Sequence, residues 1–275
     1  MTSKPTTLPA YARSSINHCN LPAVILGGLT YQKHPVPLMI DGAMEFHRQL
    51  FRSLDEIDEA SVRAVHFQDY MSSSFLLDHK DRAGFDAESQ RVRRGKADYL
   101  RLLRGWMFDS DSIEGAVLKR WVESRFGLLT RNHRGPLRDF ESSAYHAYQA
   151  DFVRGLYNAN ALEAQLDLLY SYCQYELRRR FPGQQHWSLY RGINRLESYD
   201  EVQPLADNRM MVLLNNLNSF SSDREHACAF GDSVLTAQVP LPKLLYFYDL
   251  LPGILKVERE FLVIGGVYEV ESASY

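Results

Sequence analysis

The chain has 275 residues, with 31 lysines and arginines against 34 aspartates and glutamates and a formal net charge of −3. A chain of this length can bury a core without disulfide or metal staples. Its 45% hydrophobic and 24% charged residues are typical of a soluble globular protein and argue against a disordered, collagen-like or membrane-bundle protein, and the near-neutral charge argues against nucleic acid as a partner.

The first 42 residues contain prolines at 5, 9, 22, 35 and 37 together with Gly27 and Gly28, and we expect an extended, loop-rich lead-in rather than a helix. Neither this segment nor any later window has the roughly 20 apolar residues that a membrane span needs, and the start of the chain has no apolar core typical of a secretory signal. The three cysteines stand far apart and form no CxxC motif, which favours a reducing cytoplasm and no metal site.

From about residue 43 to residue 181 the pattern is helical. Asp111 and Glu114 are placed like a capping pair at the start of one helix. Its apolar stripe consists of Ile113, Val117, Trp121 and Val122. A second strong helix is predicted over 161–181, where three arginines at 178–180 suit the negative end of the helix dipole and a Pro-Gly pair follows.

After Gly183 the pattern changes to short runs of Val, Leu, Ile, Tyr and Phe separated by turn residues, which is typical of successive strands. We predict strands over 187–193, 211–220, 234–239, 244–248, 259–264 and 267–271, with one short helix over 224–230. Helices followed by strands indicate an α+β protein with a mainly antiparallel sheet. We place the loop-rich and helical region at 1–140 and the strand-rich core at 141–275, packed together as one body.

The sequence contains no P-loop and no GxGxxG motif after a strand. A basic run, formed by Arg91, Arg93, Arg94 and Lys96, allows two interpretations: a solvated helix face or turn, or a patch that docks an acidic partner.

Three separated segments of the strand-rich half carry the chemistry: LYRG at 189–192, SFSSD at 219–223 and VEREF at 257–261. Arg191 ends a predicted strand, where its guanidinium fork can hold a diphosphate while Gly192 lets the backbone approach a ligand. The alternative for Arg191 is a structural ion pair. Ser221 stands at a strand end, where it can bond a carboxylate or a ribose hydroxyl, or simply cap a helix.

Glu258 and Glu260 are two residues apart at the start of a predicted strand, so we expect both on one face of the sheet. Two adjacent carboxylates without a cation repel each other, a cost that a purely structural strand has little reason to carry. Such a pair suits a reaction in which one carboxylate stabilises a developing cation and the other orients and deprotonates a cationic acceptor. The alternative is an exposed acidic strand edge.

In this order the segments resemble the Arg–Ser–Glu signature of arginine-specific mono-ADP-ribosyltransferases. The resemblance implies that NAD is the substrate and that Arg191, Gly192, Ser221 and Phe230 bind it. It also implies that Glu260 holds the ribose and stabilises the oxocarbenium-like cation, while Glu258 serves the acceptor arginine.

The resemblance extends over nearly the whole chain to the dinitrogenase reductase ADP-ribosyltransferases of nitrogen-fixing bacteria, through NLP at 20–22, QKHPVPL at 32–38 and the block at 187–192. It implies dinitrogenase reductase as the protein substrate, an off-switch for nitrogen fixation, and regulation by a PII-type signalling protein. One departure is Asp223, which stands where the family has a third hydroxyl residue. Either Ser219 or Ser221 can be the signature serine, and we prefer Ser221 because it immediately precedes the helix-opening segment.

Two other functions remain open on the sequence. One is NAD hydrolysis or transfer to a different arginine protein, and the other is a non-catalytic module that binds NAD or a partner. The intact Arg191, Glu258 and Glu260 argue against the module.

Overall fold

Helices fill the first part of the chain and strands the second in the computed structural model, which describes residues 7–77, 98–156, 161–194, 200–205, 208–253 and 259–274. The helices are α1 (Ala23–Leu26), α2 (Leu29–Lys33), α3 (Ala43–Phe46), α4 (Arg48–Asp55), α5 (Ala60–Phe75), α6 (Tyr99–Phe108), α7 (Ile113–Phe126), α8 (Ser143–Leu156), α9 (Leu162–Arg180) and α10 (Arg224–Cys228). The strands are β1 (His186–Ile193), β2 (Asp200–Pro204), β3 (Arg209–Ser221), β4 (Ser233–Pro240), β5 (Leu244–Phe247) and β6 (Glu260–Ser274). The α+β class predicted from the sequence is confirmed.

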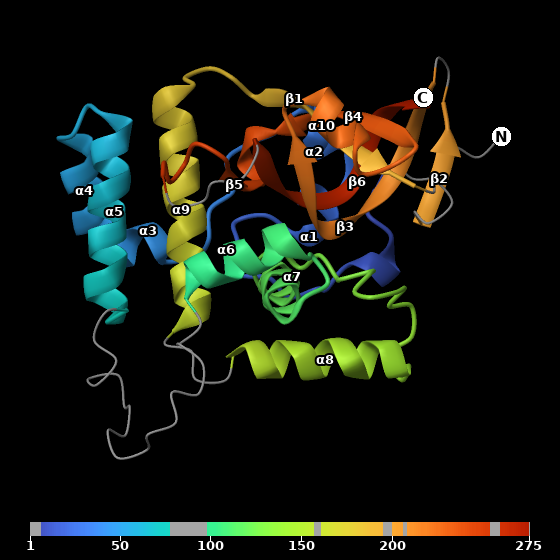
Figure 1. Cartoon of the computed structure of the whole chain (residues 1–275), viewed down its shortest axis with the longest axis horizontal. Coiled ribbons are helices and arrows are strands. Elements are labelled where there is room, and N and C mark those ends of the chain that lie inside the picture. Colours follow the sequence, from blue (N-terminus) through green and yellow to red (C-terminus); the bar gives the residue numbers. More distant parts are fainter. Residues whose placement is uncertain are drawn as a thin grey trace.

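The long helices lie beside and beneath a small barrel of strands (Figure 1). Helix α5 packs against α4 and α9, and these three stand side by side at the left of the view. Helices α7 and α8 pack together below the barrel, and α6 connects the two groups because it contacts both α7 and α9. The helical region therefore covers more than one side of the barrel.

The strands form one antiparallel sheet in the order β2-β3-β1-β4-β6-β5, and β3 also pairs with β6. This extra pairing closes β3, β1, β4 and β6 into a barrel. The register places Ser221 of β3 opposite both Tyr190 of β1 and Glu260 of β6. The three signature segments consequently meet at one place on the barrel.

One large hydrophobic core runs through the helices and the barrel, and a small second cluster consists of Ala116, Leu137 and Tyr148. Helix α9 lies on β5, where the Gln174 side chain donates to the Leu244 carbonyl at 2.8 Å and the Cys173 thiol donates to the same oxygen at 3.4 Å. Helix α7 is tied to β3 by Asn216, whose amide donates to the Lys119 carbonyl at 2.7 Å. The helical region and the barrel share their interior.

The lead-in differs from the sequence prediction, because α1 and α2 are short helices within residues 1–42. Pro22 immediately precedes the first turn of α1, a position where its missing N–H costs no hydrogen bond. The Gly27 carbonyl accepts a hydrogen bond from the Val267 amide at 2.8 Å. Gly266 is required opposite it, since its φ is +118° and a Cβ there would lie 2.7 Å from the Gly27 oxygen.

The side chain of Gln32 completes the sheet where β4 and β6 separate. The last residue pair between these strands is Ala237 with Val270. Just beyond it, the Gln32 amide nitrogen donates to the carbonyls of Gln238 at 3.2 Å and Glu269 at 3.0 Å, and its oxygen accepts from the Glu269 N–H at 2.7 Å. The amide group therefore satisfies backbone groups that no neighbouring strand reaches.

Two local predictions were wrong, and one strand was missed. Helix α7 is capped by the Ser112 hydroxyl, which accepts from the Gly115 N–H at 3.1 Å, so Asp111 and Glu114 are not its capping pair. The segments 259–264 and 267–271 form one strand, β6, which begins at Glu260. Its two glycines at 265–266, a turn signal in sequence, instead accommodate the irregularity in β3, because a Cβ on Gly265 would lie 1.7 Å from the Asn215 carbonyl oxygen. Strand β2 is polar and was not predicted.

Lys243 is completely buried in the 3-10 turn before β5. Its ammonium donates to the Gly265 carbonyl at 2.7 Å and lies 4.7 Å from the centre of the Tyr268 ring. Burial lowers the pKa of Lys243 from its ordinary 10.5 to about 7. Since the unfolded chain holds this proton up to about its ordinary pKa, the unfolded state binds more protons than the folded state between those two values.

We therefore expect the free energy of unfolding to rise with pH above neutrality, with the unfolding constant falling about tenfold per pH unit through this one group. Lys243→Met should remove that part of the slope, and urea unfolding of both proteins between pH 6.5 and 9 measures it. Lys33→Met, at a lysine that is 53% exposed, is the matched control and should keep the slope. Identical slopes for wild type and Lys243→Met would contradict the prediction.

Candidate active site

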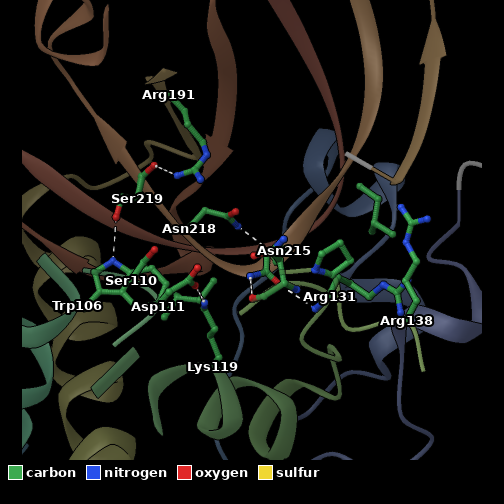
Figure 2. A pocket seen from close by; sticks show the side chains of 14 residues that line it. Trp106, Ser110, Asp111, Lys119, Arg131, Arg138, Arg191, Asn215, Asn218 and Ser219 are labelled. Atoms are coloured by element: carbon green, nitrogen blue, oxygen red, sulfur yellow. Dashed lines mark hydrogen bonds and ion pairs between the residues drawn. The ribbon is translucent and has the colours of Figure 1, made fainter. Parts of the chain in front are cut away.

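Arg191, Ser219 and Glu260 are in direct contact. Arg191 leaves β1 with its guanidinium donating to the Ser219 carbonyl at 2.7 Å (Figure 2). The Ser219 hydroxyl donates to Glu260 Oε1 at 2.6 Å. The residues stand on three neighbouring strands, β1, β3 and β6. The structure thus brings an arginine, a serine and a glutamate of the three signature segments together.

The serine whose side chain forms a hydrogen bond with Glu260 is Ser219, whereas the sequence favours Ser221, which lies opposite Glu260 in the strand register. The two are two residues apart on β3 and so lie on the same face. The Ser221 hydroxyl accepts a hydrogen bond from the Asp223 N–H at 3.0 Å, which fixes the turn into α10. Asp223 itself caps α10, accepting from the N–H groups of Glu225 and His226 at 3.0 and 3.3 Å. A carboxylate at this position therefore has a clear structural use.

The Glu260 carboxyl lies in a partly buried place at the start of β6. Burial raises the pKa of Glu260, and the hydrogen bond from Ser219 together with the positive fields of His226 and Arg191 opposes that rise. The residue before it, Arg259, has a φ of +43° and is therefore not in an extended conformation. The alternation argument that placed Glu258 and Glu260 on one face therefore does not apply, and Glu258 lies outside the described residues.

Gly192 and Phe230 are in contact where α10 packs on β1. A Cβ on Gly192 would lie 2.1 Å from the Ala227 carbonyl and 3.1 Å from Phe230 Cβ. The glycine is thus needed for the approach of α10, not only for that of a ligand. The Phe230 ring is 62% exposed and meets the His226 ring edge-on, with 5.1 Å between their centres. The ring is exposed next to α10 and is not among the residues that line the pocket described below.

A pocket of about 300 Å³ opens beside Arg191 and Ser219 (Figure 2). Helices α6 and α7 contribute Trp106 and Lys119, and the segment between α7 and α8 contributes Arg131 and Arg138. The remaining lining residues are Ser110, Asp111, Asn132, Pro136, Leu213, Asn215, Leu217 and Asn218. The pocket therefore lies between the helical region and the barrel.

Cationic side chains outnumber carboxylates among the described residues that line the pocket. These cations are Lys119, Arg131, Arg138 and Arg191, and the carboxylate in this set is that of Asp111. Lys119 is buried and donates to Asp111 Oδ1 at 2.6 Å, so this pair is internally neutral. The three arginines bring guanidinium groups to the pocket, and such groups suit a phosphate or diphosphate.

The irregularity in β3 holds the α7–α8 segment against the barrel. The Asn215 side-chain oxygen accepts from the N–H groups of Arg131 and Asn132 at 2.9 and 3.3 Å, and its nitrogen donates to the Asn132 carbonyl at 2.9 Å. The Arg131 guanidinium lies 4.7 Å from the centre of the Tyr11 ring. These contacts set where Arg131 enters the pocket.

Sequence reasoning missed Trp106, Lys119, Arg131 and Arg138, because it found no chemistry-bearing residue in the helical region. Trp106 and Lys119 follow a helical pattern that is indistinguishable from core packing and surface charge.

The basic run at 91–96 lies outside the described residues. Among the residues that are described, no group of side chains could hold a metal ion and no helix is long and apolar enough to cross a membrane.

A known protein family matches nearly the whole chain. The family model of dinitrogenase reductase ADP-ribosyltransferase (DRAT) matches residues 16–272. The chain belongs to the DRAT family. A similar DRAT protein, the NAD(+)–dinitrogen-reductase ADP-D-ribosyltransferase of Rhodospirillum rubrum, is 40% identical over 263 residues, which cover 95% of each chain. No solved structure matches. The resemblance to DRAT drawn from the sequence is confirmed.

Proposed function

We propose that this chain transfers ADP-ribose from NAD to one arginine of dinitrogenase reductase. The observation that carries the proposal is the hydrogen-bonded set of Arg191, Ser219 and Glu260 beside a pocket lined with arginines, in a chain of the DRAT family. The R. rubrum relative is named for NAD and for this acceptor protein. Both assignments come to this chain by its similarity to that relative.

The pocket has side chains of the kind that bind the diphosphate of the substrate. NAD carries a diphosphate, and Arg191 with Arg131 and Arg138 supplies guanidinium groups that can bind phosphate oxygens in pairs. Phe230 offers an exposed aromatic ring near Gly192, the residue that follows Arg191. We assign the diphosphate of NAD to this pocket and the nicotinamide ribose to the neighbourhood of Glu260.

The reaction breaks the bond between the nicotinamide nitrogen and ribose C1′, and the bonding electron pair leaves with nicotinamide. The ribose becomes oxocarbenium-like, and the Glu260 carboxylate stabilises this positive charge while it bonds a ribose hydroxyl. An arginine nitrogen of the acceptor then forms the new bond to C1′. We assign to Glu258 the orientation of that cationic guanidinium and the removal of its proton.

We also propose that residues from about 43 to 140 recognise the acceptor protein and a PII-type regulator, and that the protein works in the cytoplasm. Selecting one arginine among many requires contacts away from the reacting group. The basic run at 91–96 is the first candidate for such contacts.

The experiment that tests the function is incubation of the purified chain with labelled NAD and an extract of nitrogen-fixing cells, which supplies both acceptor and regulator. One labelled band at dinitrogenase reductase supports the proposal. Many labelled bands would indicate another specificity, free ADP-ribose alone would indicate an NAD hydrolase, and no product would indicate a binding module. Each of these three results overturns it.

Arg191→Lys tests the assignment of the diphosphate. Lysine keeps the charge but loses the fork of paired donors, so NAD should bind more weakly by about 1–3 kcal/mol. Calorimetric titration with NAD measures this loss. The control is Arg209→Lys, at an exposed arginine of β3 whose guanidinium pairs with Glu269 at 3.0 Å, and it should bind NAD as the wild type does. An unchanged affinity for NAD in Arg191→Lys would indicate that Arg191 has only a structural role.

A further inference from the structure

Trp106 of α6 reaches from the helical region to the serine that holds Glu260. Its side chain is almost fully buried, and its indole N–H donates to the Ser219 hydroxyl oxygen at 2.8 Å. The same hydroxyl donates to Glu260 Oε1 at 2.6 Å. Figure 2 shows the indole pointing toward Ser219. One continuous chain of hydrogen bonds therefore joins a helix of the first half to the proposed catalytic carboxylate.

The chemistry of the three groups gives this chain a fixed direction. An indole N–H can only donate, and a serine hydroxyl has a single hydrogen. When Trp106 donates to the Ser219 oxygen, the hydroxyl hydrogen is directed toward Glu260, which accepts it as a carboxylate. One carboxylate oxygen is thereby held, and the other is left for a ribose hydroxyl.

The position of Trp106 is itself well fixed. Helix α6 packs closely on α7 at Gly105, where a Cβ would lie 2.5 Å from Glu114 Cβ. Glu114 also accepts a hydrogen bond from Arg101 of α6 at 3.1 Å. The Lys119 ammonium lies 5.8 Å from the centre of the Trp106 ring. Helix α7 thus determines where the indole points.

We infer that Trp106 is a positioning residue for the transfer reaction, one that acts through Ser219 to hold the Glu260 carboxylate in the orientation that stabilises the ribose cation. This inference rests on the proposed function. It makes the helical region part of the catalytic machinery as well as a surface for recognition. The hydrogen bonds of Ser219 and Trp106 also lower the pKa of Glu260 and so oppose the rise that burial causes.

The test is Trp106→Phe, which keeps a buried ring and removes only the N–H. We expect kcat to fall about tenfold, as for loss of one hydrogen bond to a charged network, while KM for NAD stays within about twofold. The acid limb of the kcat–pH profile should move to higher pH, because the ionised Glu260 loses support. Ser219→Ala should produce the same changes, and the double variant should be no worse than Ser219→Ala alone.

Trp121→Phe is the matched control. Trp121 lies on the adjacent helix α7, is as deeply buried, and donates its N–H to the Asp167 carboxylate at 2.7 Å, away from the pocket. It should lower the melting temperature as Trp106→Phe does but leave kcat and the acid limb unchanged.

Three outcomes would overturn the inference: wild-type kcat and pH profile in Trp106→Phe, equal kcat losses in both tryptophan variants, or multiplying losses in the double variant with Ser219→Ala. These outcomes are distinguishable from failure of the proposed function, for which Glu260→Gln is the indicator. If Glu260→Gln is inactive and Trp106→Phe behaves as wild type, only the positioning role is lost.

Discussion

Glu260→Gln is expected to lose at least about a hundredfold in both ADP-ribose transfer and NAD hydrolysis, the scale of losing one electrostatic stabiliser in an active site. Glutamine keeps the shape and can still accept the Ser219 hydrogen bond, but it carries no negative charge for the oxocarbenium-like ribose. Single-turnover assays with labelled NAD, with and without an acceptor arginine, measure both activities. Near-normal turnover would remove Glu260 from the mechanism.

The control is Glu271→Gln, which changes the same functional group on the same strand at an exposed position. It should retain full activity. The wild-type enzyme offers a second check, since burial raises the pKa of Glu260. The ionised carboxylate is the active form, so activity should fall on acidification at a higher pH than an ordinary carboxyl would give, and Glu260→Gln should show no such limb in its residual activity.

Glu258→Gln is expected to abolish transfer to the protein acceptor while keeping much of any slow NAD hydrolysis. Hydrolysis uses water instead of a cationic guanidinium, so it needs no residue to orient the acceptor. Glu260 is still present to stabilise the ribose cation. Free ADP-ribose and acceptor-bound label, counted in the same reaction, give the ratio directly. Equal losses of the two products would show that Glu258 and Glu260 do not have separate roles.

Much of the fold follows from periodicity. Helix α9 and strands β1, β3 and β4 have strong apolar patterns, and their predicted bounds differ from the observed ones by one or two residues. Strand β2 was missed because its sequence, DEVQP, is polar and contains a proline. Strand β6 was divided because a Gly-Gly pair usually marks a turn, and only the partner strand shows that Gly265 faces the irregularity at Asn215.

The candidate site was predictable only where a local stretch of sequence indicates chemistry. Arg191 and Glu260 stand in short segments whose order indicates their chemistry. Period-two alternation gives the face shared by Ser219 and Ser221, but it cannot tell which hydroxyl reaches the carboxylate. Trp106 lies 113 residues from Ser219, and no local pattern reports a contact over that separation.

The Gln32 side chain also determines when the protein can complete its fold. It bonds backbone groups 206 and 237 residues away, at Gln238 and Glu269. During synthesis α5 and α9 can form from local contacts, but the Gln32 side chain cannot make these bonds until β4 and β6 have left the ribosome. The contacts of α2 with the sheet therefore form only after β6 has been made. Productive folding is thus a late event of the whole chain, and a nascent chain that stops before β6 has no route to a closed barrel.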